Sequence, residues 1–141
     1  MSIVLCGVDD TEAGTTVMAA AKAAAKRAGA PVVLTYVSTT HWGEEIPAFQ
    51  ADDGATPRVV EYGPPADRLL AMADAHDARL IVLGTRAKRW RSVARRVAKQ
   101  ARCPVMIVGP AADPLAEPVA HPRFDREHLA SAEAPVVVAP G

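Results

Sequence analysis

The sequence predicts an α/β fold built on an open parallel sheet. The prediction rests on one unit, in which Leu80–Leu83 and Val105–Val108 are short apolar runs on either side of an amphipathic helical pattern. Short continuous apolar runs are typical of strands that are buried on both faces. Two strands joined by a helical crossover lie parallel, with a right-handed connection.

The helical pattern of this unit begins at Ser92. Its two faces differ in character: Val93, Ala94, Val97, Ala98 and Ala101 form an apolar face, and Arg95, Arg96, Lys99 and Arg102 form a basic one. The apolar face is expected to pack on the sheet.

The first half of the chain repeats the alternation of strand and helix. A buried strand is predicted at Ile3–Val8, and an alanine-rich helix runs from about Ala13 to Ala28, ended by Gly29. The remaining expected elements are strands at Pro31–Ser38 and Arg58–Tyr62 and a helix over about Ala66–Ala78, with His76 as a helix-end residue.

Composition is that of one ordinary globular domain of 141 residues. The formal net charge is zero, but no Asp or Glu occurs between Asp77 and Asp113, where nine of the 16 Lys and Arg lie. This uneven distribution indicates a local anionic partner, such as a small anionic ligand.

The cysteine content and the lack of a long apolar segment indicate the kind of protein and its compartment. Cys6 and Cys103 are interpreted as small core residues, because their number and spacing match neither a disulfide nor a zinc framework. The N-terminus shows no leader pattern, and no run of eighteen apolar residues follows. We therefore expect a cytoplasmic protein without a membrane partner.

Candidate ligand-binding residues follow two of the predicted strands. Asp9 ends the first strand, where open α/β sheets bind ligands, and it could reach a ribose or an amine; the alternative is that it caps the next helix. Gly84, Thr85, Arg86 and Ser92 lie where a strand feeds a helix N-terminus, which is a natural anion site. The alternative there is an ordinary strand-to-helix turn beside a solvated basic helix.

Two segments have weaker patterns. Residues 39–57 form a long connection whose His41, Glu44, Glu45, Asp52 and Asp53 lack the fixed spacing of a metal site, so no metal is expected. Beyond Val108, proline-rich Gly109–His121 is expected to hold no regular element. A short helix over Arg126–Glu133 and a strand over 135–139 are predicted to follow, the latter capping a sheet edge or crossing into a partner subunit.

Several of these pieces, taken in order, resemble the universal stress protein family. The matching segments are Val8-Asp9-Asp10-Thr11-Glu12-Ala13, Gly63-Pro64-Pro65-Ala66, Leu80-Ile81-Val82-Leu83-Gly84-Thr85-Arg86, Ser92-Val93-Ala94 and Cys103-Pro104-Val105. The resemblance covers about residues 2–108, which we expect to form the α/β domain, with 109–141 as a Pro/Ala-rich tail. It implies a parallel five-stranded sheet in the order 3-2-1-4-5 with helices on both faces, the second helix here reduced to a loop, and an extra C-terminal strand. It also implies a homodimer, often formed through the last strand.

The resemblance also implies an adenine-nucleotide site. In that site Asp9 would meet the ribose, Val37 the adenine, Gly84, Thr85 and Arg86 the phosphate region, and Ser92 with the Val93 N–H the terminal phosphates. This sequence departs from the family's ATP pattern, Gly-x2-Gly-x9-Gly-Ser/Thr: Ala87 and Arg91 replace the second and third glycines, and only three residues separate them. Four residue steps span about 14 Å where ten span about 35 Å, so the loop is too short to wrap a triphosphate.

The resemblance therefore implies a nonenzymatic binding or regulatory module in stress response, and the shortened loop indicates weak or lost adenine-nucleotide binding with no required cofactor. One alternative is a small adenine-nucleotide-hydrolysing enzyme of related fold, although no nucleophile-and-base arrangement is evident. Another is a nucleic-acid binder that uses Trp90 and the basic face of residues 86–102.

Overall fold

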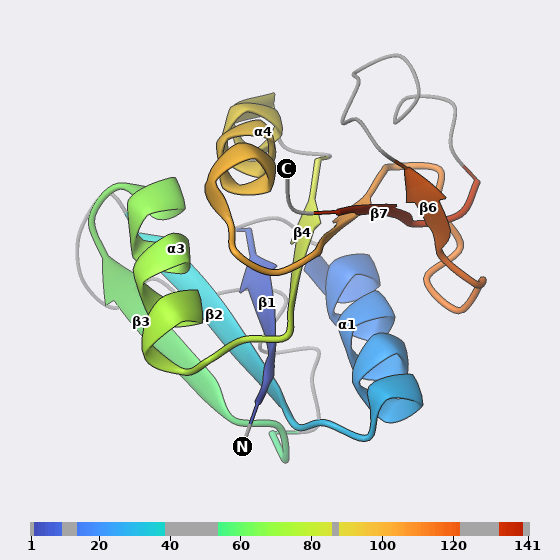
Figure 1. The fold of residues 1–141 in the computed structure, drawn as a ribbon, viewed down its shortest axis with the longest axis horizontal. Helices are drawn as coiled ribbons and strands as arrows, with labels where there is room; N and C mark the ends of the chain where they lie inside the picture. Colours follow the sequence, from blue (N-terminus) through green and yellow to red (C-terminus); the bar gives the residue numbers. More distant parts are fainter. Residues whose placement is uncertain (1, 10–13, 39–53, 86–87, 122–132, 140–141) are drawn as a thin grey trace.

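The fold is a sheet of seven strands between helices. The computed structural model describes residues 2–9, 14–38, 54–85, 88–121 and 133–139. The strand order is β3-β2-β1-β4-β5-β7-β6 (Figure 1). The elements are β1 Val4–Val8, α1 Gly14–Ala28, β2 Val32–Ser38, β3 Arg58–Tyr62, α3 Pro65–Ala75, β4 Leu80–Gly84, α4 Lys88–Gln100, β5 Val105–Val108, β6 Val119–His121 and β7 Val136–Val138.

The first five strands confirm the predicted parallel sheet and its order. β1 pairs with β2 and β4, β2 pairs with β3, and β4 pairs with β5, all in parallel. Because β1 and β4 are central and covered on both faces, their residues are almost completely buried.

The two remaining strands extend the sheet beyond β5. β7 confirms the predicted C-terminal strand and pairs antiparallel with β5 of its own chain, so that Ile107 lies opposite Val136. The prediction that Gly109–His121 holds no regular element is wrong, because β6 forms at its end and pairs in parallel with β7. Pro118 does not prevent this strand: the Val119 N–H still donates to the Pro135 carbonyl at 2.9 Å, and β6 is an edge strand, where a neighbouring proline is tolerated.

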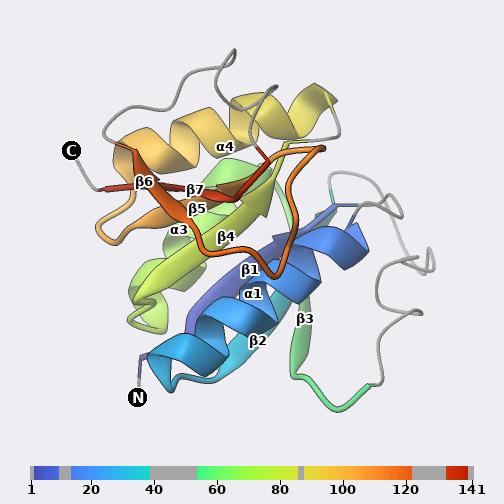
Figure 2. The ribbon, with the colours of Figure 1, turned by 90° about the vertical axis from the view of Figure 1, so that its right-hand side faces the viewer.

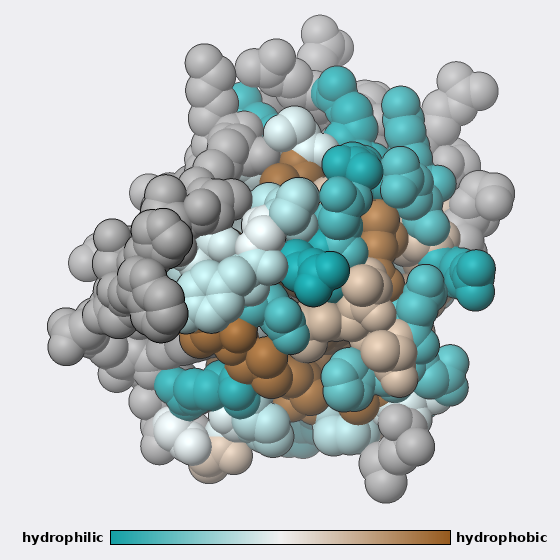
Figure 3. Space-filling view, turned by 90° about the vertical axis from the view of Figure 1, so that its left-hand side faces the viewer, coloured by the Kyte–Doolittle hydropathy of each residue, from teal (hydrophilic) through white to brown (hydrophobic). Residues whose placement is uncertain are grey.

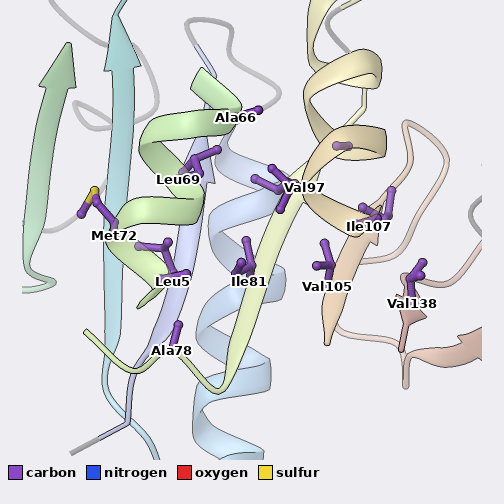
Figure 4. Close-up of a cluster of buried hydrophobic side chains, with 14 of the residues drawn as sticks. Leu5, Ala66, Leu69, Met72, Ala78, Ile81, Val97, Val105, Ile107 and Val138 are labelled. Atoms are coloured by element: carbon purple, nitrogen blue, oxygen red, sulfur yellow. The ribbon is translucent and has the colours of Figure 1, made fainter. Parts of the chain in front are cut away.

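The helices cover the two faces of the sheet unequally in the described part of the chain (Figure 2). On one face α1 packs its alanines against alternate side chains of the strands, including Cys6, Leu34, Val82 and Met106. On the other face α3 and α4 lie against Leu5, Ile81, Ile107 and their neighbours (Figure 4). Residues 39–53, which include the predicted reduced helix, lie outside the described residues.

Helix α4 begins at Lys88, earlier than the predicted start at Ser92. The anchor of its first turn is Trp90, which is buried and packs in the same core as Ala94 and Val97. These three residues follow helical spacing, so the apolar stripe was present in the sequence. The predicted helix leaves out Trp90, because this residue lies within a run of basic residues.

Helices α1 and α3 end in the same way but with different residues. After α1, the Ala30 N–H donates to the Ala25 carbonyl and Gly29 has φ +63°; after α3, the Ala78 N–H donates to the Ala73 carbonyl and Asp77 has φ +50°. Both are Schellman motifs, whose left-handed position favours glycine. The motif ends α3 at Ala75, before the predicted Ala78, and confirms His76 as a helix-end residue.

Glycine at position 77 is expected to stabilise the protein. The left-handed backbone costs an L-residue about 1–2 kcal/mol, and the extra entropy lost by glycine offsets about 0.5–1 kcal/mol of that. Asp77→Gly should therefore raise the free energy of unfolding by about 0.5–1 kcal/mol, measured by urea denaturation. Gly29→Asp is the matched reverse change and should lower it; a destabilising Asp77→Gly would contradict the interpretation.

Gly84 is expected to be required by packing. A Cβ built at Gly84 would lie 2.6 Å from Val17 Cγ2 of α1, and valine is stiff at χ1. Gly84→Ala should therefore cost about 1–3 kcal/mol of unfolding free energy through overpacking.

The companion substitution Val17→Ala removes the clashing methyl groups. In the double variant the two costs should fall short of additivity by about 1 kcal/mol in a double-mutant cycle monitored by urea denaturation. Strict additivity would show that Val17 does not limit residue 84.

Candidate functional site

The carboxyl ends of β1, β2 and β4 bring three polar residues to one edge of the sheet. Gly7 pairs with Leu83, so extending the register by two residues places Asp9 level with Thr85. Ser38 ends β2 beside them. All three are buried, with exposed fractions of 3% for Asp9, 8% for Ser38 and 2% for Thr85. This edge is where open α/β sheets bind ligands.

Thr85 is held through both of its backbone polar groups. Its N–H donates to the Val108 carbonyl at 3.2 Å, which continues the pairing of β4 with β5. Its carbonyl accepts a hydrogen bond from Arg91 Nε, also at 3.2 Å. The predicted phosphate-region residue therefore has its N–H engaged in the sheet.

Arg91 ties the first turns of α4 to the end of β4 through this bond. The guanidinium is partly buried, and the bond uses one of its five N–H donors, so the group can still meet an anion. The sequence identified Arg91 only as a basic residue that replaces a glycine of the family's ATP pattern, and it did not predict this contact with Thr85. The missed signal is its spacing, because an arginine seven residues after a strand end and inside the next helix can reach back to the residue that follows the strand.

Two other predicted site residues serve the core. Val37 is completely buried and packs in the cluster beneath α3 and α4. Gly84 accommodates Val17 of α1. Their predicted contacts with adenine and phosphate stay predictions, but each has a packing reason for its identity.

The remaining predicted phosphate contacts lie on or before α4. Ser92 is exposed and Val93 is partly buried, and both lie beyond the first turn of the helix. Because only the first N–H groups of a helix lack an internal partner, the Val93 N–H falls within the hydrogen-bonded part of α4. Arg86 lies outside the described residues. The roles of these three residues stay predictions.

Trp90 is buried and does not lie on a surface that could bind a partner. Its side chain is 1% exposed, and its indole N–H has no hydrogen-bond partner in the described part of the chain. The ring packs over Gly7, where an added Cβ would lie 3.2 Å from Trp90 Cζ3. The suggestion that Trp90 binds nucleic acid is therefore wrong, although Arg95, Arg96, Lys99 and Arg102 form an exposed basic face as predicted.

The two cysteines differ more than predicted. Cys6 is completely buried, and burial raises the pKa of its thiol. Cys103 precedes β5 and is only partly buried. Burial, together with the negative charges of Asp74 and Asp77, raises the pKa of the Cys103 thiol. Cys6 is a core residue as predicted, and Cys103 is partly buried and packs against the edge of the core.

No metal or membrane site is found among the residues that the structure describes. No group of three or more His, Cys, Asp or Glu is arranged there to hold a metal ion. None of the described helices has the length and apolarity needed to cross a bilayer. The candidates His41, Glu44, Glu45, Asp52 and Asp53 fall outside these residues.

Comparison with known proteins identifies the fold. Universal stress protein UspA from Lactobacillus plantarum has a TM-score of 0.60 and 21% identity, and the match covers 75% of this chain and 96% of that one. A universal stress protein from Archaeoglobus fulgidus in complex with dAMP has a TM-score of 0.56 and 22% identity, over 76% of this chain and 97% of that one. A universal stress protein in complex with cAMP has a TM-score of 0.58 and 19% identity, over 76% of this chain and 96% of that one.

Sequence comparisons give a partial match. A comparison with curated proteins found no match. Residues 43–109, which run to the end of β5 and include the Gly84–Thr85 edge, match the family model described as universal stress protein family. Residues 43–109 are thus similar in sequence to this family, and the chain shares the fold of universal stress proteins.

Proposed function

We propose that this protein is a nonenzymatic binding module of stress response whose carboxyl-edge site holds adenine nucleotides weakly and favours monophosphates over ATP. The bond from Arg91 Nε to the Thr85 carbonyl is the observation that carries the proposal. It places a guanidinium across the end of β4, at the position where the family's ATP pattern has glycine.

The length of the connection supports the same preference. Only residues 85–87 separate β4 from α4, so the chain crosses from strand to helix without an extended loop. A wrapped triphosphate needs a series of free backbone N–H groups, and the Thr85 N–H is already used by Val108. A single phosphate needs fewer donors, and the guanidinium can supply two of them in a fork. The similar structures with dAMP and cAMP carry one phosphate each.

A calorimetric titration with AMP and ATP tests this proposal. The native chain is expected to bind AMP weakly and ATP negligibly. Arg91→Ala removes a charge-assisted donor worth about 1.4 kcal/mol, so AMP affinity should fall about tenfold.

Lys99→Ala is the matched control, because it removes one positive charge from the exposed side of the same helix. It should leave AMP affinity within about twofold, since an exposed charge at that distance is largely screened. Micromolar binding of ATP by the native chain would overturn the proposal.

We also propose that two copies associate through the C-terminal region. β7 lies between β5 and β6, so both of its edges are paired within the chain. Among the strands that the structure describes, the outermost on this side is β6, where Val119 is 50% exposed; Leu115, four residues before Val119, is 70% exposed. Unpaired strand edges with apolar residues favour pairing with another chain.

Light scattering coupled to size-exclusion chromatography tests the association. The native protein should have twice its monomer mass of 14.8 kDa. Val119→Lys should give a monomer if β6 edges pair, because charge on an edge strand blocks pairing. Val60→Lys is the control at the opposite edge, on β3, where Val60 is 43% exposed (Figure 3 shows this side).

A dimer that survives Val119→Lys would indicate that β7 is exchanged between subunits instead. A native monomer would overturn the proposed association.

A further inference from the structure

A cavity of about 190 Å³ lies at the opposite edge of the sheet from the carboxyl-edge site. It opens where the ends of α3 and α4 meet the starts of β4 and β5. We name it the amino-edge pocket; its lining residues are Leu70, Ala73, Asp74, Asp77, Ala78, Ala101, Arg102 and Cys103.

The floor of the amino-edge pocket is apolar and its rim is charged. Ala78 is buried, and Leu70, Ala101 and Cys103 are partly buried, so they offer a floor for a short alkyl chain. The carboxylates of Asp74 and Asp77 and the guanidinium of Arg102 are exposed. Among the described residues no ion pair joins these three side chains to one another. Both signs of charge are therefore available to one ligand.

The backbone adds to the negative potential of the pocket. Helix α3 ends at Ala75 and α4 ends at Gln100, so the carboxyl ends of both helices lie beside the cavity. The carboxyl end of a helix carries a partial negative charge that favours cations. With two carboxylates and one guanidinium, the pocket as a whole attracts positive charge.

The backbone and the carboxylate of Asp77 are both fixed at the edge of the pocket. It occupies the left-handed position of a Schellman motif, at φ +50°, where Gly29 stands in the matching motif of α1. Its carboxylate is oriented by Ser2, whose Oγ donates to Asp77 Oδ2 at 3.2 Å. The carboxylate of Asp77 is therefore held by a hydrogen bond at the lining of the cavity.

We propose that the amino-edge pocket binds a small metabolite with two ammonium groups and one carboxylate, of the class of basic amino acids. The ammonium groups meet Asp74 and Asp77, the carboxylate meets Arg102, and the alkyl chain lies on the alanine floor. The cavity has room for about six water molecules at roughly 30 Å³ each, well below the size of sites for drug-sized ligands. This site is separate from the nucleotide site and does not depend on it.

Cys103 provides the readout, because its thiol lines the pocket. Its alkylation by iodoacetamide, a neutral reagent, is followed by intact-protein mass spectrometry, with completely buried Cys6 as the slow internal reference. L-Lysine at ten times its Kd should slow alkylation of Cys103 about tenfold, since the free pocket falls to about one-eleventh. Norleucine, which lacks the side-chain ammonium, and 1,5-diaminopentane, which lacks the carboxylate, should each need about tenfold higher concentration for equal protection.

Substitutions separate specific binding from a general effect of the amino acid. In Asp74→Asn/Asp77→Asn, lysine should no longer protect Cys103, while the unprotected rate should rise because the thiol loses two neighbouring negative charges. Asparagine tolerates the left-handed position, so the fold is retained. Arg102→Gln should make lysine no better than 1,5-diaminopentane.

Glu117→Gln is the matched control, since it removes an exposed carboxylate outside the pocket and should leave protection unchanged. Absence of protection in the native chain at high lysine concentration would overturn the proposal. Equal protection in the native chain and the Asp74→Asn/Asp77→Asn variant would overturn it as well.

Discussion

The close approach of helices to both faces of the central strands is the constraint on which the rest of this structure depends. β1 and β4 are buried on both faces, so the layers can come together only where side chains leave room. Gly7 leaves room for Leu83 and the ring of Trp90 on one face, and Gly84 leaves room for Val17 on the other. Trp90 in turn fixes the first turn of α4 and thereby the position of Arg91. The geometry of the carboxyl edge is thus a consequence of packing in the layers beneath it.

The same edge shows how one short connection changes a binding site. With α4 beginning at Lys88, the chain has little backbone left to surround phosphates. Arg91 fills part of the space by contacting the Thr85 carbonyl. The Arg91 guanidinium can offer positive charge to a phosphate, but it does not replace the series of backbone N–H groups that a longer loop would supply. The proposed preference for a compact anion would follow from this connection alone, without a change of fold.

The two ends of the sheet differ in the sign of the charge that they present. At the carboxyl ends of the strands the helix N-terminus and Arg91 provide positive charge, whereas at the amino ends the helix C-termini and Asp74 and Asp77 provide negative charge. This polarity follows from parallel β-α-β connections, which orient every crossover helix in the same direction. An α/β protein with ligands at both edges would therefore hold anions at one and cations at the other.

The sequence by itself determined the parallel strands and the amphipathic faces of the helices, because buried runs such as Leu80–Leu83 and the apolar stripe of α4 record burial directly. The order of the strands came from the resemblance to universal stress proteins and not from these patterns. The sequence also indicated the C-terminal strand through Val136–Val138. Only the tertiary structure decided that β7 and β6 continue the sheet within the chain, because β6 has three residues and no pattern of its own. Only the tertiary structure, likewise, brought Asp74 and Asp77 to Arg102 and Cys103, because proximity between the ends of two helices depends on how they pack and leaves no periodic trace in the sequence.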